Sequence, residues 1–377
     1  MNKKIGIISH YYNSTNYGGL LQAFALCRCV NESGIKAEQL CYDSSNRERS
    51  VIIRIKRSIK LVFDKIILLK HYKSYKCIKQ RIRSIKNFRD SIPHSNFVFS
   101  DSTIYKANDM YDAFIVGSDQ VWNPRLFRNV YSLLFTNKMK FSYAASLAVE
   151  SVDSNQLINY QKALSDYIYV SVRERSALNI LRFYPNVQLC LDPVFLLTSE
   201  QWSEICESNI INEKYVFAYL LGDNLVSRQE AVKYAAKLGL KLVCIPYLLN
   251  KYKKCDDNFG DIQICDVSPQ RFLSLIKYSE CVFTDSFHAV CFSYIFKKNF
   301  YVFKRDVSGS MNTRITDILE TLELKDRYVD FVDNPTNIDY RIIPVSKLEC
   351  LKTSSETFLR DIVEFVKKQN EMDESYD

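Results

Sequence analysis

The fold is decided by residues 281–303, which read CVFTDSFHAVCFSYIFKKNFYVF. The short apolar run Cys281–Thr284 predicts a buried strand, and Ala289–Lys297 predicts a helix. Phe300–Phe303 predicts a second strand, so the segment is a complete strand–helix–strand unit. Because the helix returns the chain to the same end of the sheet, the two strands are expected to pair in parallel. This unit therefore predicts an α/β fold.

The same alternation extends in both directions along the chain. In the second half, strands are predicted at 215–221, 241–246 and 261–265, and helices at 225–238 and 269–278. In the first half, strands are predicted at 4–9, 36–42, 113–117, 141–147 and 167–172, and a helix at 20–31. Acidic and polar residues accumulate near 195–213, which marks a boundary. We expect two doubly wound Rossmann-type domains, residues 1–195 and 213–340, facing a central cleft, with a C-terminal amphipathic helix and tail at 341–377.

Composition excludes several classes of protein. With 377 residues, 47% hydrophobic and 25% charged, the chain is globular and long enough for two domains. No apolar run is long enough to span a membrane. Twelve cysteines without a CxxC pair exclude a disulfide scaffold and a zinc ribbon, and favour a cytoplasmic protein. The four histidines are scattered, so we expect neither a metal nor a cofactor.

Positive charge is concentrated in residues 51–89. This segment has thirteen Lys and Arg residues and one acid, Asp64, in a chain whose net charge is +8, so the rest is mildly acidic. Isoleucines recur at steps of three and four, which predicts helices with an apolar and a cationic face. We expect a basic helical insertion at 51–90 that either packs on its own domain or docks on an anionic membrane surface. Such a localised charge argues against nucleic-acid binding.

Two polar motifs follow predicted strands of the first half. Glycine is scarce, nine in 377 residues, so the pair Gly18–Gly19 before a helix is informative. Such a turn lets backbone N–H groups approach an anion or a sugar hydroxyl, although a plain tight turn has the same sequence. Residues 117–123, GSDQVWN, surround Trp122 with polar side chains, which suits a carbohydrate; a helix cap with a half-buried tryptophan is the alternative. Asp119 is also placed to deprotonate an attacking hydroxyl.

Arg173 and His288 are the candidate anion-binding and acid residues. Arg173 ends a predicted strand and offers a bidentate fork for carboxylate or phosphate, unless Glu174 pairs with it in a structural salt bridge. His288 stands where the strand 281–284 turns into a helix. The helix N-terminus favours a neutral ring, and an anion bound beside it favours the protonated form. His288 then becomes an acid only when the anion is present; a capping or core role is the alternative.

Six motifs together resemble, in their order, the polysaccharide pyruvyl transferases. They are NYGGLLQA (16–23), GSDQVWN (117–123), SVRE (171–174), LDP (191–193), TDSFH (284–288) and SMNTRI (310–315). The resemblance implies a GT-B-like fold and the transfer of pyruvate from phosphoenolpyruvate, the donor substrate, to a saccharide, giving a pyruvate ketal. The acceptor is often a lipid-linked precursor of an exopolysaccharide or capsule, which implies a peripheral enzyme at the inner face of the cell membrane.

The resemblance also implies roles for single residues. In family members an Arg–Leu–His run and an arginine of the first domain hold the donor. Here Ser286 and Phe287 replace the first two residues of that run, so Arg314 or Arg305 has to supply the missing charge. Catalysis is expected from His288 as general acid and from Asp119. Donor binding is expected from Arg173 of the first domain and from Ser286, Phe287 and Arg314 of the C-terminal domain, the donor side. Acceptor binding is expected on the N-terminal side from Tyr17, Gly18, Gly19, Gln120, Trp122 and Asn123.

Two rival functions stay open at this point. A GT-B glycosyltransferase that uses a nucleotide sugar commonly has an acidic residue for the ribose in this C-terminal helix region, but there is no Asp or Glu between Ser286 and Arg305. A non-catalytic membrane-associated scaffold rests on residues 51–89 alone. It leaves the polar motifs at the strand ends unexplained.

Overall fold

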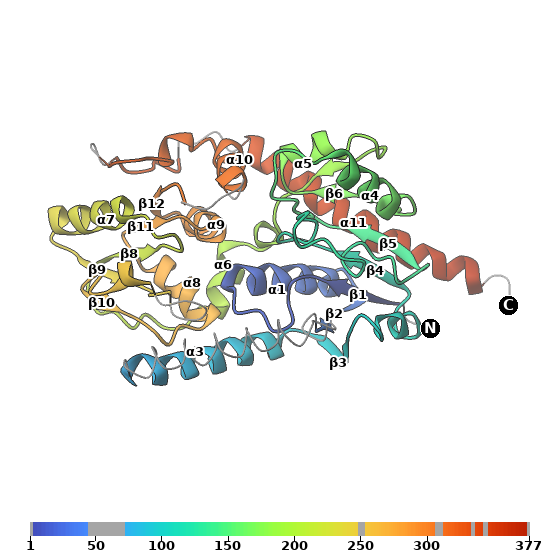
Figure 1. The fold of residues 1–377 in the computed structure, drawn as a ribbon, viewed down its shortest axis with the longest axis horizontal. Coiled ribbons are helices and arrows are strands. Elements are labelled where there is room, and N and C mark those ends of the chain that lie inside the picture. Colours follow the sequence, from blue (N-terminus) through green and yellow to red (C-terminus); the bar gives the residue numbers. More distant parts are fainter. Residues whose placement is uncertain are drawn as a thin grey trace.

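Two five-stranded parallel sheets form the framework of the protein, one in each half of the chain (Figure 1). The computed structural model describes residues 3–43, 72–247, 253–305, 312–332, 336–341 and 346–374. The N-terminal sheet has the order β3–β2–β1–β4–β5, with β1 (Lys4–Ile8), β2 (Lys36–Tyr42), β3 (His94–Phe99), β4 (Ala113–Val116) and β5 (Met139–Ser142). The C-terminal sheet has the order β10–β9–β8–β11–β12, with β8 (Tyr215–Tyr219), β9 (Lys241–Cys244), β10 (Ile262–Gln263), β11 (Cys281–Thr284) and β12 (Asn299–Val302).

Both sheets are doubly wound, because the strand order reverses between β1 and β4 and again between β8 and β11. The helices that cover them are α1 (Tyr17–Glu32), α3 (Tyr72–Ser91), α4 (Ser154–Leu164), α5 (Arg175–Ile180), α6 (Ser199–Ile205), α7 (Leu225–Leu238), α8 (Pro269–Lys277), α9 (Phe287–Ile295), α10 (Thr313–Thr321) and α11 (Ser346–Glu374). A short pair, β6 (Ser171–Val172) and β7 (Gln188–Leu189), continues the N-terminal sheet through isolated bridges. The predicted α/β class is confirmed; the domain boundaries stay a prediction.

Helix ends follow the signals in the sequence. The side chain of Asn224 caps α7 by accepting the N–H groups of Val226 and Ser227, and Gly239 ends the helix in the left-handed region at φ 64°. The predicted strand at 141–147 is shorter, because Ala144 has a φ of 48° and the chain leaves the sheet after Ser142. Helix α9 begins at Phe287, earlier than predicted, so His288 lies in its first turn.

Two long helices tie the halves together (Figure 1). Helix α11 comes from the end of the chain and packs on the N-terminal sheet, where Phe365 contacts Phe141 and Phe358 contacts Tyr143. Helix α3 comes from the N-terminal half and packs against α8 of the other half. The Arg81 side chain of α3 is buried, donates from Nη1 to the Pro246 carbonyl over 3.0 Å and lies over the Tyr17 ring.

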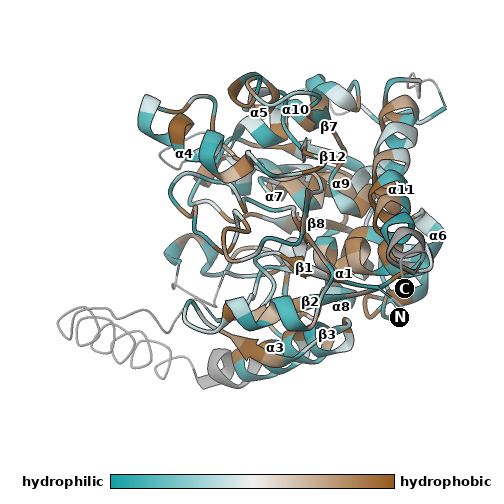
Figure 2. Ribbon diagram, turned by 90° about the vertical axis from the view of Figure 1, so that its right-hand side faces the viewer, coloured by the Kyte–Doolittle hydropathy of each residue, from teal (hydrophilic) through white to brown (hydrophobic). Residues whose placement is uncertain are grey.

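Helix α3 is the described part of the predicted basic insertion, and residues 51–71 lie outside the described residues. Its side chains at Ile78, Ile85 and Phe88 are buried, so this helix packs on its own chain. The side chains of Lys79, Arg83 and Lys86 are exposed on the opposite side. Figure 2 shows α3 at the edge of the molecule beside β2 and β3. Among the described helices, none combines the length and the apolar character that a membrane span requires.

We expect Arg81→Ala to lower the free energy of unfolding by about 1–3 kcal/mol, because it leaves the buried Pro246 carbonyl without its donor. Arg83→Ala is the matched control on the exposed side of α3, and it should change the value by less than about 0.5 kcal/mol. Urea unfolding of both variants measures the difference. Equal effects of the two substitutions would show that α3 does not fasten the halves through Arg81.

Candidate active site

The motif residues converge between the two halves, at the carboxyl ends of the strands. Asp119 follows β4 and Arg173 follows β6, whereas His288 and Arg314 come from the first turns of α9 and α10. The Arg314 Nη1 lies 3.1 Å from Asp119 Oδ1, and the His288 Nε2 lies 3.5 Å from Asp192 Oδ2. Both contacts join residues of different halves, so the site exists only where the halves meet.

Arg173 is at the centre of a buried ion cluster. Its Nη1 donates to the Asp192 carboxylate, its Nε lies 3.4 Å from Glu174 Oε1, and its Nη2 donates to Ser146 Oγ over 3.1 Å. The Phe287 ring covers the guanidinium at 4.3 Å. Each guanidinium nitrogen has a partner, so the salt-bridged alternative to a free fork is confirmed. Donor binding by Arg173 stays a prediction.

Asp119 is held by donors from both halves. Besides the Arg314 contact, its carboxylate accepts the Asn16 Nδ2 at 3.3 Å and lies 3.8 Å from Arg173 Nη2. Burial alone would raise the pKa of Asp119, but the positive charges of His288, Arg314 and Arg173 outweigh it and lower the pKa. A carboxylate stabilised in this way is a weak base, so it suits the holding of Arg314 better than the predicted uptake of a proton.

Asp192, from the LDP motif, is the most important site residue that sequence analysis missed. It is fully buried, and its carboxylate accepts Arg173, the Ser118 hydroxyl at 3.3 Å and the Val194 N–H at 3.1 Å. Burial opposes the ionised form, but the charges of His288 and Arg173 lower the pKa of Asp192 well below its ordinary value. The available signal in the sequence was the LDP motif itself, in which an acid precedes a proline.

His288 is buried in the first turn of α9, and its Nε2 makes no hydrogen bond within the described part of the chain. The ring packs edge-on against Phe287. It also packs on Gly18, where an added Cβ would lie 2.0 Å from the imidazole Nδ1. His288 therefore leaves no room for a side chain at position 18. The predicted contact of Gly18 with an acceptor stays a prediction.

Two of the predicted acceptor residues are core residues. Trp122 is fully buried, and its Nε1 donates to the Tyr131 carbonyl over 2.9 Å. Tyr17 is also buried; its hydroxyl donates to the Val267 carbonyl over 2.9 Å and its ring stacks on Phe272. Neither ring can cover a sugar, so these two predictions are wrong. They are wrong because an aromatic ring at a strand end can point into the core as well as into a cleft.

The other predicted acceptor residues line the start of α1 and the loop after β4. Gly19 donates its N–H to Asn16 Oδ1, and Asn123 donates to the Gln120 side chain over 3.1 Å.

His10, which sequence analysis missed, follows β1; its Nε2 lies 3.4 Å from the Gln120 carbonyl. Burial lowers the pKa of His10 by more than the negative charge of Asp119 raises it. A half-buried neutral imidazole at a strand end is suited to accept a proton, and its place after the first strand was the available signal.

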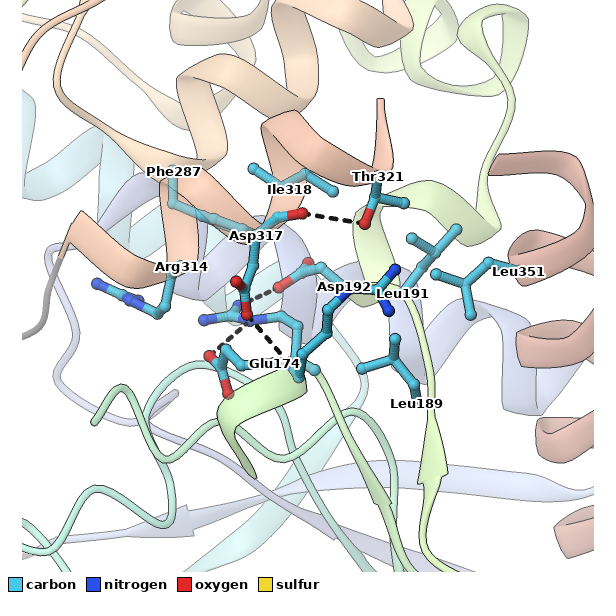
Figure 3. Close-up of a pocket in the computed structure, with 12 residues that line it drawn as sticks. Glu174, Leu189, Leu191, Asp192, Phe287, Arg314, Asp317, Ile318, Thr321 and Leu351 are labelled. Carbon is cyan, nitrogen blue, oxygen red and sulfur yellow. Dashed lines mark hydrogen bonds and ion pairs between the residues drawn. The ribbon is translucent and has the colours of Figure 1, made fainter. Parts of the chain in front are cut away.

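One pocket adjoins the cluster. It has a volume of about 20 Å³ and is bounded by the polar residues Glu174, Asp192 and Arg314 and by the apolar residues Phe287, Leu189, Leu191 and Leu351 (Figure 3). Such a volume holds about one water molecule.

A second polar cluster lies at the carboxyl edge of the C-terminal sheet. The Asp285 carboxylate accepts the N–H groups of Leu221 at 2.8 Å and Gly222 at 2.6 Å, directly after β8. The Arg305 Nη2 donates to the Asp285 carbonyl over 2.5 Å. Ser286 is the N-cap residue of α9, but its side chain makes no capping hydrogen bond. The Asp285 carboxylate thus occupies the backbone N–H groups that follow β8.

Comparisons with known proteins agree with this arrangement. Residues 16–307 match the family described as polysaccharide pyruvyl transferase. None of the curated proteins matches the chain. Among solved structures, the UDP-GlcNAc 2-epimerase from Methanocaldococcus jannaschii has a TM-score of 0.52 at 13% identity, covering 87% of this chain and 88% of that one. The UDP-N-acetylglucosamine 2-epimerase from Rickettsia bellii has a TM-score of 0.51 at 11% identity, covering 98% of each chain. Arabidopsis thaliana UGT89C1, complexed with UDP-L-rhamnose, has a TM-score of 0.50 at 10% identity, covering 97% and 99%. These likenesses show a GT-B-like fold.

We expect Asp192→Asn to lower the free energy of unfolding at neutral pH by about 3–5 kcal/mol, because Arg173 loses a buried partner. The pKa of Asp192 is lowered in the folded state, so its contribution is complete above the unfolded value of about 3.9 and is lost as the pH falls below it. The difference between wild type and variant should therefore shrink below about pH 4. Urea titrations across this range measure it. Glu280→Gln, which removes a half-exposed partner of the exposed Lys214, is the control and should cost less than about 1 kcal/mol; a constant gap between wild type and Asp192→Asn at all pH values would contradict the prediction.

Proposed function

The chain belongs to the polysaccharide pyruvyl transferase family, and we propose that it transfers the pyruvyl group of phosphoenolpyruvate to two hydroxyls of a saccharide. The observation that carries this proposal is the buried His288 Nε2, which lacks a hydrogen-bond partner among the described residues and lies at the start of a helix between the two halves. A general acid must be able to direct its ring nitrogen at the atom that it protonates. The His288 Nε2 makes no hydrogen bond to another described residue, and the Asp192 carboxylate lies 3.5 Å from it.

The proposed reaction begins with protonation of phosphoenolpyruvate and ends with closure of the ketal. His288 gives its proton to the methylene carbon of phosphoenolpyruvate, and the electrons of the carbon–carbon double bond form the new C–H bond. An acceptor hydroxyl attacks the resulting oxocarbenium carbon and loses its proton to a base on the N-terminal side. The bond from this carbon to the phosphate oxygen breaks, inorganic phosphate leaves, and a second hydroxyl closes the ketal. One hydroxyl proton replaces the proton of His288, and the other leaves with phosphate.

The contacts at Asp285 favour this function over a nucleotide-sugar glycosyltransferase. Backbone N–H groups after the first strand of a doubly wound domain commonly bind the phosphates of a nucleotide. Here those of Leu221 and Gly222 are taken by the Asp285 carboxylate, so they are not available to a diphosphate. A non-catalytic scaffold gives no reason for a buried histidine whose Nε2 lacks a hydrogen-bond partner among the described residues.

We expect His288→Ala to lower kcat for phosphate release from phosphoenolpyruvate by about 10²–10⁴-fold, while the KM for phosphoenolpyruvate changes far less. The assay measures inorganic phosphate in the presence of candidate saccharides, and mass spectrometry identifies the ketal. His94→Ala is the control, because that ring lies at the start of β3 and contacts the Ile92 carbonyl. If removal of the ring unfolds the protein, His288→Gln keeps the volume without the acid. Near-normal kcat in a folded His288 variant would refute the assignment.

The acceptor in this proposal is a lipid-linked saccharide, and the exposed cations of α3 bring the enzyme to an anionic cytoplasmic membrane surface. Lys79, Arg83 and Lys86 lie on the outer side of that helix, and each cation near such a surface contributes about 1 kcal/mol. We expect the full-length protein to sediment with phosphatidylglycerol vesicles at low salt and to be released at high salt. Arg83→Glu with Lys86→Glu should weaken sedimentation, whereas Lys237→Glu on α7 should not. Equal binding by all three proteins would exclude α3 as the contact.

A further inference from the structure

Three arginines approach the start of α9, and acids neutralise them to different degrees. Arg173 has three carboxylates within 4.0 Å, those of Asp119, Glu174 and Asp192. Arg305 contacts one carboxylate, that of Asp285, and only from Nη2 at 3.3 Å. This carboxylate already accepts two backbone N–H groups. Arg314 also contacts one carboxylate, that of Asp119. Arg305 and Arg314 therefore keep more capacity for another anion than Arg173 does.

The side chain of Asn312 holds Arg305 next to Arg314 through two hydrogen bonds. The Asn312 side chain accepts the N–H of Arg305 at 3.1 Å and donates to its carbonyl over 3.2 Å. Asn312 directly precedes α10, whose second residue is Arg314. This pair of hydrogen bonds holds the end of β12 against the start of α10. The guanidinium groups of Arg305 and Arg314 thus share one end of α9.

Several hydrogen-bond donors at this place have no acceptor among the described residues. The Nε atoms of Arg305 and Arg314 are buried without a partner, and so is the His288 Nε2. Arg314 and His288 are each more than nine-tenths buried. The Ser286 side chain does not cap α9, so it leaves the N–H groups of the first turn without that acceptor. Burial and the neighbouring charges of Arg173 and Arg305 lower the pKa of Arg314 against the opposing charge of Asp119.

The chemistry that satisfies all of these groups is an anion. A phosphate or carboxylate group accepts several N–H donors at once, and a helix N-terminus with two guanidinium groups stabilises its charge. Access is also favourable on this side, because the Arg305 side chain is 13% exposed whereas those of Arg173 and Arg314 are 3% and 7% exposed. Residue 286 is a serine, so α9 itself supplies no cation there.

We propose that Arg305 binds an anionic group of the donor substrate at the N-terminus of α9, together with Arg314. This rests on the proposed function, because it assumes a donor that carries phosphate and carboxylate. In this proposal the main donor-binding cation is Arg305, which follows β12, and not Arg173. Gly222 makes room for the arrangement, since an added Cβ would lie 3.1 Å from Arg305 Cγ and 2.9 Å from Asp285 Oδ2.

The test compares Arg305→Ala, Arg305→Lys and the control Lys304→Ala in the full-length protein. We expect Arg305→Ala to raise the KM and the Kd for phosphoenolpyruvate by about 10- to 100-fold, the range for loss of one charge-assisted hydrogen bond, with a smaller change in kcat. Arg305→Lys keeps the charge without the planar fork and should fall between wild type and Arg305→Ala. Lys304→Ala removes an exposed neighbouring cation and should match wild type. Binding is measured by thermal shift and calorimetry with phosphoenolpyruvate and, separately, with inorganic phosphate.

The outcomes separate this inference from the proposed function. Active wild-type enzyme with an unchanged KM and Kd in Arg305→Ala overturns the role of Arg305 and leaves the function standing. Inorganic phosphate that stabilises the wild type but not Arg305→Ala, without any pyruvyl transfer, supports the anion site and contradicts the function. If neither anion binds the wild type, both are refuted. If Arg305→Ala does not fold, the same comparison between wild type and Arg305→Lys decides, because a donor-binding arginine loses affinity on that exchange.

Discussion

A buried carboxylate must keep cations beside it, and Asp119 takes its cations from both halves of the chain. Arg173 reaches it from the N-terminal half and Arg314 from the C-terminal half. Removing one partner of a buried ion pair costs about 3–5 kcal/mol, so this single group holds the halves in register at the site. The position of α9 follows from it, because α10 carries Arg314 and packs on α9. His288 is thereby brought against Gly18 of α1.

The charges of this cluster explain why a histidine belongs there. The carboxylates of Asp119, Asp192 and Glu174 face the guanidinium groups of Arg173 and Arg314, all of them buried. Acids outnumber arginines in this group, so a further polar group from the C-terminal half is favourable beside Asp192. The His288 ring supplies it, with Nε2 at 3.5 Å from Asp192 Oδ2.

Much of the fold could be predicted from the sequence, because its helices and strands carry local signals. Asn224 and Gly239 set both ends of α7, and the runs 36–42 and 281–284 are strands with the predicted bounds. The gathering of the motifs was predictable too, because parallel strands end at one edge. Side-chain direction was not: Trp122 and Tyr17 point into the core, and two of the acids around Arg173, Asp119 and Asp192, come from distant segments. The sequence contains no local signal for contacts of that kind, whereas the adjacent Glu174 was open to prediction.

The contacts between the halves differ in their chemical character. On the α3 side, Arg81 donates to the Pro246 carbonyl and Tyr17 to the Val267 carbonyl. On the site side, the contacts are between charged groups, Asp119 with Arg314 and Asp192 with His288. An anionic substrate competes with carboxylates for cations but has nothing to offer a carbonyl. Competition of this kind acts on the contacts at the site, where Arg314 and His288 are held by the carboxylates of Asp119 and Asp192. The contact of Tyr17 with the Val267 carbonyl involves no charged group and is not open to it.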